Sequence, residues 1–301
     1  MKTRIVQNEP NDPTSEGASG MPTVQTVEVT GSSATAPTNG FRAFVRRREL
    51  VIFFAISYLI AWSTLPWGSF LAFSPLLSAI IVVAVAEGWR GLAQLGRRLI
   101  RWRVNWIWYA AAIGLPLLVH AVAIGLNMAA GAPAPSLAQF HPWYAVLLLF
   151  GLRMVDFTDG PMGEEPAWRG FAQPRLQSRW SPFASAAVLG LLITGWHLPL
   201  VFMPQFDLGL PDIASTVFVT FWYAWLFNRT GGSVLLPLIA HVTEGCINTQ
   251  PLWPAGPDAD RHAGMWLISW ALLVVALLIF DWKSWRTAPE SAIDRVPGRI
   301  S

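Results

Sequence analysis

The chain has 301 residues, of which 53% are hydrophobic and only 13% are charged. Soluble domains carry about 25% charged residues, so this composition excludes an ordinary water-soluble domain and favours a protein that crosses a membrane several times. The net charge of +3 is small and its basic residues lie between apolar segments, a pattern that sets membrane topology and argues against a nucleic-acid partner. The single cysteine, Cys246, excludes an internal disulfide and a cysteine-ligated zinc site.

The chain begins with a polar segment, residues 1–44, that is rich in Thr, Ser, Pro and Gly. It has no apolar stripe with which to offset the entropy of ordering, so it is predicted to be a disordered cytosolic tail. A basic run at 46–48 directly precedes the first apolar segment and is expected to stay in the cytoplasm. Residues 45–285 are the predicted transmembrane domain, and 286–301 are expected to form a short cytosolic tail.

Eight apolar segments approach the roughly 20 residues that a membrane-spanning helix needs, which predicts an all-α, polytopic membrane protein. Several are short or interrupted by Pro or Gly, so one of them could be re-entrant. They are 49–66, 69–87, 105–127, 143–162, 182–202, 211–228, 232–250 and 264–281. Residues 88–103 differ, because Leu and Trp alternate with arginines at helical spacing, which predicts an amphipathic helix on an anionic leaflet.

The charges between these segments predict the orientation of the chain in the membrane. Arginines gather in 88–103, and Arg175, Arg179 and Arg229 fall in later alternate loops. The intervening loops 127–142 and 203–212 contain no Lys or Arg. By the positive-inside rule, this alternation predicts an even number of spans with both termini in the cytoplasm.

Two adjacent carboxylates, Glu164 and Glu165, follow the fourth apolar segment. Ionisable groups near membrane depth are costly and by default indicate a functional site. Pro166 suggests that a helix starts anew or kinks here. Glu165 and Arg169 are spaced i, i+4, which allows an ion pair on one helix face and leaves Glu164 pointing elsewhere. The alternative is an interfacial helix with ordinary surface charges.

Two histidines inside apolar segments are candidate partners of these carboxylates. His197 lies two residues before Pro199, which weakens the helix at a depth where a cavity or protein must cover the freed carbonyls. His241, Glu244 and Asn248 project from one helix face, which suggests a lined cavity. In the alternative interpretation, both histidines are structural hydrogen-bonding groups between helices.

The other ionisable residues in the apolar region are expected to have structural roles or to be solvated. His120 is alone in an apolar segment and is expected to be a structural hydrogen-bonding group. His141 and His262 are expected to be solvated in loops on the far face. Arg153 could pair with the aspartates that follow it, including Asp159, and stiffen the end of that helix.

One glutamate and two histidines can activate a water molecule for hydrolysis. The carboxylate can act as general base while a histidine orients the water and another group stabilises an oxyanion. The same side chains also match the His₂Glu ligand set of catalytic zinc. Spacing alone leaves both mechanisms open. The sequence contains no H-E-x-x-H, G-x-S-x-G or P-loop pattern, so a serine or cysteine nucleophile is not indicated.

The stretch from Glu164 to Gly170 resembles the E-E-x-x-x-R-G motif of the CPBP family of intramembrane proteases. This family includes type II CAAX prenyl endopeptidases, bacteriocin-processing and immunity proteins, and lysostaphin-resistance-protein-A-like proteins. Its second motif, F-x-x-x-H, corresponds to 193–197, with Ile193 in place of phenylalanine. Its third, H-x-x-x-N or H-x-x-x-D, starts at His241 but ends on Gly245. The resemblance covers roughly residues 140–250.

The resemblance implies a role for each residue that matches a motif. Glu164 would activate the hydrolytic water together with His197, while Glu165 and Arg169 would hold the helix of Glu164 in place. If a metal such as Zn²⁺ is used, Glu164, His197 and His241 would be its ligands. The implied activity is cleavage of a peptide bond in a membrane-associated substrate, such as a prenylated or CAAX-like protein, near the cytosolic leaflet.

The third motif departs from the family at Gly245. His241 would help to form the oxyanion site, for which the family adds a polar residue one turn later. Asn248 lies on roughly the same face and is the preferred replacement, because the carboxylate of Glu244 would repel an oxyanion. The altered motif also leaves open an alternative, a catalytically inactive family member that acts as a membrane immunity or scaffold protein.

Overall fold

The computed structural model describes residues 40–247 and 252–293, and every regular element in these ranges is a helix. The all-α prediction is therefore confirmed. Residues 1–39 of the predicted N-terminal tail lie outside the described residues. Its remaining residues, 40–44, form the start of α1 (Gly40–Arg47). At the other end, α13 (Trp282–Arg286) is followed by the 3₁₀ turn η7 (Glu290–Ala292), whose Ala292 is buried and accepts a hydrogen bond from Gln177. Part of the predicted C-terminal tail is thus packed against the protein.

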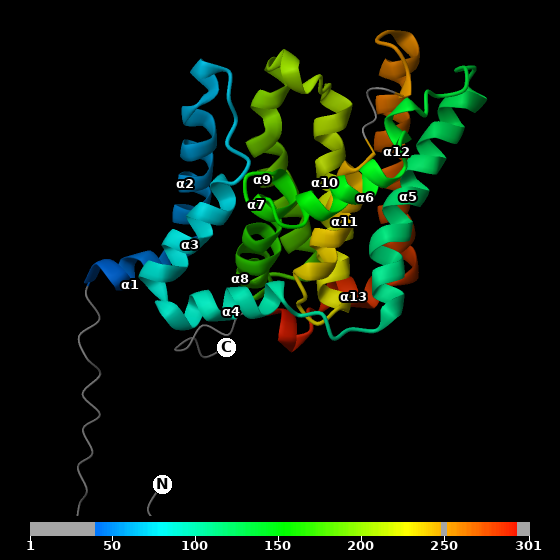
Figure 1. Ribbon diagram of the computed structural model, residues 1–301. Helices are drawn as coiled ribbons and strands as arrows, with labels where there is room; N and C mark the ends of the chain where they lie inside the picture. Colours follow the sequence, from blue (N-terminus) through cyan, green and yellow to red (C-terminus); the bar gives the residue numbers. More distant parts are fainter. Residues whose placement is uncertain (1–39, 248–251, 294–301) are drawn as a thin grey trace, which may run out of the picture. The chain divides into compact units, whose positions relative to one another are not determined.

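Five helical segments of the described ranges are long and apolar enough to span a membrane (Figure 1). Two of them join an α-helix to a 3₁₀ turn: α2 (Glu49–Ser63) with η1 (Leu65–Trp67), and α9 (Pro182–His197) with η4 (Leu198–Phe202). The other three are α5 (Trp106–Ala129), α10 (Leu210–Arg229) and α12 (Pro257–Phe280). These segments and the shorter apolar helices form a multi-pass membrane protein.

The remaining three predicted spans form shorter helices, so the number eight is not confirmed. Segment 69–87 contains α3 (Ser74–Ala86), and 232–250 contains α11 (Leu235–Gly245). Segment 143–162 is divided between α6 (Tyr144–Arg153) and the start of α7 (Gly160–Ala167). At about 1.5 Å per residue, none of these helices reaches the roughly 30 Å of a bilayer core.

The predicted amphipathic segment forms α4 (Trp89–Leu99), whose basic residues are not all at the surface. Arg98 is buried and donates a hydrogen bond to the carbonyl of Gly170 at 2.8 Å. Its guanidinium also lies over the ring of Phe227. One face of α4 is therefore fixed to the protein, in addition to any contact that its exposed arginines make with lipid.

A helical rod at the centre of the fold consists of α7, the π-helical turn η3 (Trp168–Ala172) and α8 (Gln173–Gln177). Every residue from 161 to 177 is buried, because the rod packs against α3, α4, α9, α10 and α11. Arg175, predicted in a cytosolic loop, is instead buried in α8 and paired with Glu49 and Glu87. The ion pairs provide partners for charge that the rod takes out of water.

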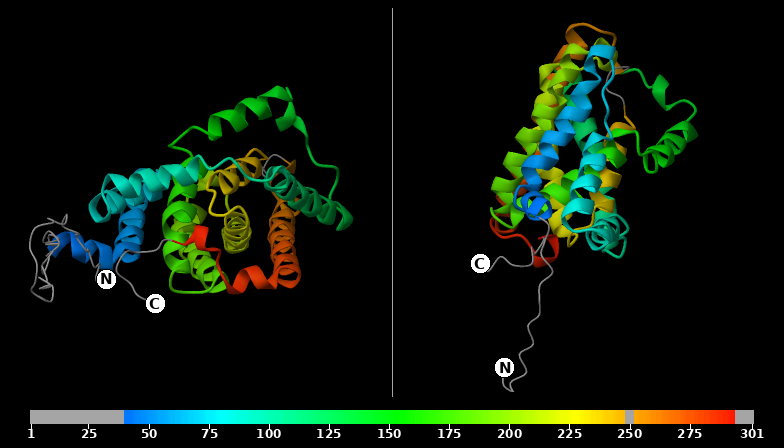
Figure 2. Two further views of the ribbon diagram at one scale, coloured as in Figure 1. Left: turned by 90° about the horizontal axis from the view of Figure 1, so that it is seen from below. Right: turned by 90° about the vertical axis from the view of Figure 1, so that its left-hand side faces the viewer.

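Outside the rod, α9 packs against α10, α10 against α12, α12 against α5 and α5 against α11, and α11 returns to α7 (Figure 2, left). The helix α6 lies outside this set: none of its residues is buried, and the right-hand view of Figure 2 shows it apart from the others. Its last residue, Arg153, nevertheless bonds to the carbonyl of Gly245 at the end of α11. This arrangement leaves a space between α7, α9, α10 and α11 into which polar side chains point.

Candidate active site

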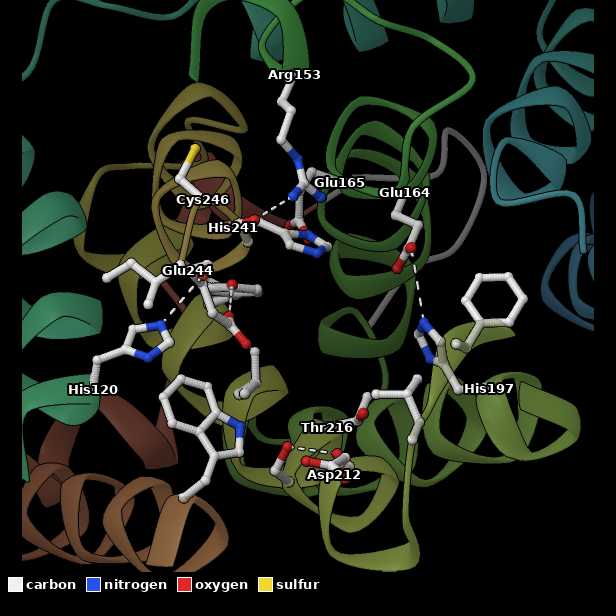
Figure 3. Close-up of a pocket in the computed structure, with 18 of the residues that line it drawn as sticks. His120, Arg153, Glu164, Glu165, His197, Asp212, Thr216, His241, Glu244 and Cys246 are labelled. Carbon is white, nitrogen blue, oxygen red and sulfur yellow. Dashed lines mark hydrogen bonds and ion pairs between the residues drawn. The ribbon is translucent and has the colours of Figure 1, made fainter. Parts of the chain in front are cut away.

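A cavity of about 760 Å³ lies among these helices and is lined by all of the predicted site residues that the structure describes. Glu164, Glu165 and Arg169 come from the central rod, His197 from α9 and His241 from α11. Figure 3 shows the Glu164 carboxylate directed at the His197 ring and the Glu165 side chain beside His241. Asn248, the remaining predicted residue, lies outside the described residues.

The carboxylates are placed by a capped helix start. The side chain of Asp159 accepts a hydrogen bond from the backbone N–H of Gly160 at 2.9 Å, and Pro161 follows in the first turn. Both features favour a helix that begins at this point. Pro166 then lies inside the helix, and the π-helical turn begins two residues later. Proline removes a backbone donor, and π-helical turns inside helices often accompany functional sites, as this one does.

Two glycines in the first turns of α7 are expected to differ sharply in their tolerance of alanine. A Cβ on Gly163 would lie 2.8 Å from the Cα of Phe73, whereas a Cβ on Gly160 would meet only the Glu164 carboxylate, at 2.9 Å. Gly163→Ala should lower the free energy of unfolding by about 1–3 kcal/mol, since backbone must move. Gly160→Ala, the matched control, should change it by less than about 1 kcal/mol, because a side chain can swing away. Thermal unfolding in detergent measures both, and equal losses would contradict this account.

Glu164 and His197 form the first of two carboxylate–histidine pairs. Glu164 Oε1 lies 3.8 Å from His197 Nε2, and its Oε2 accepts a hydrogen bond from Trp168 Nε1 at 3.1 Å. His197 Nδ1 lies 3.0 Å from the carbonyl of Ile193, which can only accept, so Nδ1 carries the proton and Nε2 faces the carboxylate. At 3.8 Å the pair is too far apart for a direct hydrogen bond, and a water beside it can bond to both.

Glu165 forms the second pair, on the other face of the rod. Its Oε1 accepts from Arg169 Nη1 at 3.0 Å, which confirms the predicted i, i+4 ion pair, and also from His241 Nδ1 at 2.9 Å. The carboxylate of Glu165 is 0% exposed, so it takes part in both contacts away from water. It therefore joins α7 to α11 and orients the His241 ring. Because Nδ1 of this ring is bonded to Glu165, its Nε2 is available to act in the cavity.

Glu244 is engaged elsewhere in the cavity. The hydroxyl of Tyr223 donates a hydrogen bond to Glu244 Oε2, and the Arg169 guanidinium lies 4.8 Å from the centre of the Tyr223 ring. His120 Nε2 lies 3.2 Å from the backbone carbonyl of Glu244, in agreement with its predicted structural role. These contacts fix the side chain of Glu244 against α10 and its backbone against α5.

A zinc ion held by Glu164, His197 and His241 stays a prediction. In the described ranges, no group of three or more His, Cys, Asp or Glu side chains is arranged to hold one metal ion. Glu164 and His197 face each other, whereas His241 is turned toward Glu165 by a hydrogen bond of 2.9 Å. The three predicted ligands line one cavity, and the bond from His241 Nδ1 leaves its Nε2 available there.

Comparison with known proteins gives the family of this region. A family model described as type II CAAX prenyl endopeptidase, Rce1-like, matches residues 148–246. These residues form an Rce1-like domain. A CAAX prenyl protease 2 from Methanococcus maripaludis is similar to this chain, with 31% identity over 88 residues, or 26% of this chain and 32% of that protein. The chain thus spans about a third of the length of the curated relative it matches.

The Rce1-like domain contains both carboxylate–histidine pairs and lies within the region 140–250 in which the resemblance was found. Sequence spacing did not indicate the bond between Glu165 and His241, because it joins helices 76 residues apart in the chain. Phe70, whose ring stacks near His197 with centroids 6.4 Å apart, comes from outside the domain and carries no motif. His262, predicted to be solvated in a loop, is instead buried, because α12 begins at Pro257 and includes it.

Proposed function

We propose that the chain is an intramembrane endopeptidase that hydrolyses a peptide bond with a water activated by Glu164 and His197. The observation that carries this proposal is the separation of 3.8 Å between Glu164 Oε1 and His197 Nε2 inside a cavity that His241 also lines. This geometry suits a water held between a base and an orienting group. The match of residues 148–246 to an endopeptidase family supports the same activity.

In the proposed reaction, the oxygen of the bound water attacks the scissile carbonyl carbon while Glu164 takes up the proton. The carbonyl π bond opens, and its electrons leave a negative charge on the oxygen. His241, paired with Glu165 through Nδ1, can carry a second proton on Nε2 and donate a hydrogen bond to that oxyanion. The C–N bond then breaks, and the proton passes from Glu164 to the leaving nitrogen, giving a carboxylic acid and an amine.

The proposed substrate is a membrane-associated peptide or protein, such as a prenylated or CAAX-like chain end. The cavity lies among apolar helices, so an extended peptide that is anchored in lipid can reach it without leaving the membrane. Membrane lipids are the other expected contact. With both termini in the cytoplasm, as the distribution of arginines predicts, cleavage would take place near the cytosolic leaflet.

The activity can be tested with purified protein in lipid vesicles and a farnesylated peptide that ends in a CAAX-like sequence. The wild type is expected to release the C-terminal fragment, detected by mass spectrometry. Glu164→Gln keeps the size of the side chain and the hydrogen bond from Trp168, but cannot take a proton, so the rate should fall by at least about 10²-fold. The same peptide without the farnesyl group measures the contribution of the lipid anchor.

Equal rates for the wild type and Glu164→Gln would rule out the proposed site. A wild type that binds the farnesylated peptide without cleaving it would instead favour the inactive immunity or scaffold protein.

A further inference from the structure

A guanidinium occupies the space next to His241 where the third motif would place a side chain. Gly245 stands at the position at which that motif has Asn or Asp. A Cβ built on Gly245 would lie 2.6 Å from Arg153 Nη1 and 2.8 Å from its Cζ. Non-bonded heavy atoms do not approach so closely, so any side chain at 245 would displace the guanidinium. The position that Arg153 takes in the structure therefore depends on a residue without a side chain at 245.

Arg153 is held by two partners, Asp159 and the Gly245 carbonyl. Its Nε lies 2.7 Å from Asp159 Oδ2, its Nη2 donates to Asp159 Oδ1 at 3.3 Å, and its Nη1 donates to the carbonyl of Gly245. Asp159 is also the cap of α7. Arg153 thus connects the end of α6, the start of the helix that carries Glu164, and the end of the helix that carries His241.

Arg153 has donors left to use toward the cavity. A guanidinium has five N–H groups, and the contacts in the described part of the chain engage Nε and one N–H of each terminal nitrogen. Arg153 lines the cavity together with Glu164 and His197 (Figure 3). Gly245 follows His241 by one helical turn on the same face, where neighbouring Cβ positions are about 5–6 Å apart. The guanidinium therefore lies about one turn from the His241 ring.

We propose that Arg153 donates a hydrogen bond, with His241, to the oxygen of the scissile carbonyl as negative charge develops on it. This role rests on the proposed endopeptidase activity and identifies a further residue of the same site. Asp159 and the Gly245 carbonyl fix the guanidinium before substrate binds, and a donor that needs no reorganisation stabilises a transition state most effectively. The polar group that the third motif places on α11 is in this chain provided from α6.

Moving the polar donor from position 153 to position 245 tests this role. Arg153→Ala should lower kcat by about 10²–10³-fold with KM nearly unchanged, because the bond forms only in the transition state. Gly245→Asn alone should also lower kcat, since it pushes the guanidinium away. Arg153→Ala/Gly245→Asn places an amide in the emptied space and should recover kcat to within about tenfold of the wild type. Cleavage of the farnesylated peptide and thermal unfolding are measured for each variant.

Asp159→Asn separates the proposed donor from the residue that positions it. It weakens the hold on the guanidinium but keeps a capping oxygen and the donor itself, so it should lower kcat by less than Arg153→Ala does. If it reduces kcat as much as Arg153→Ala, or if the double variant is no better than Arg153→Ala, the proposed hydrogen bond is wrong. If Arg153→Ala is fully active while Glu164→Gln is inactive, the role of Arg153 is wrong and the endopeptidase proposal stands. A wild type that does not cleave would overturn the endopeptidase and this role together.

Discussion

Replacing Glu165 with leucine is expected to destabilise the protein by about 3–5 kcal/mol. Glu165 is 0% exposed and Arg169 is 2% exposed, so the substitution leaves a buried guanidinium without its carboxylate. It also removes the acceptor of His241 Nδ1 and with it a link between α7 and α11. Thermal unfolding of the detergent-solubilised protein should show a fall in Tm on the order of 10 °C.

The control for this prediction removes both charges. In Glu165→Leu/Arg169→Met, no unpaired charge stays buried, and replacement of a whole buried pair by apolar side chains is often nearly neutral. The double variant is therefore expected to recover most of the lost stability while its site remains incomplete. If the double variant is as unstable as Glu165→Leu, the loss arises from the link to His241 or from packing, and the desolvated guanidinium is not its cause.

Replacing His197 with alanine is expected to lower the rate of cleavage by about 10²–10⁴-fold and to leave the fold intact. The described hydrogen bond of His197 goes to the Ile193 carbonyl in its own helix, so its loss removes no link between helices. What is lost is the group that faces Glu164 across 3.8 Å and orients the water. Cleavage of the farnesylated peptide and Tm are measured together.

His141→Ala is the matched control for His197→Ala, because His141 is exposed in a loop and does not line the cavity. It should cleave at the wild-type rate. If His197→Ala retains more than about a tenth of the wild-type rate, Glu164 activates water without this histidine.

The sequence alone was sufficient for the contacts that depend on helical spacing. Glu165 and Arg169 are four residues apart, and a helix places such residues on one face, where the structure has their ion pair. The pairing of Arg153 with Asp159 was likewise anticipated, because both residues lie in one short stretch of the fourth apolar segment. Composition was enough for the all-α membrane class, since so few charges cannot cover a water-facing surface.

Apolar length did not determine the number of spans. The segments 69–87 and 232–250 are apolar along most of their length, yet their helices have 13 and 11 residues. Both pack against the buried central rod, so their apolar residues are covered by protein as well as by lipid. Hydropathy does not distinguish these two environments, because both exclude water.

The chain by itself determined which chemical groups are available: two carboxylates and an arginine at helical spacing, with two histidines in apolar helices. Tertiary structure decided their partners. It pairs Glu164 with His197 and Glu165 with His241, and it places Arg153 against Gly245. These contacts join helices that are far apart in the sequence, so they depend on which helix faces pack together. Local spacing specifies one face of one helix, and only packing brings two faces to the same cavity.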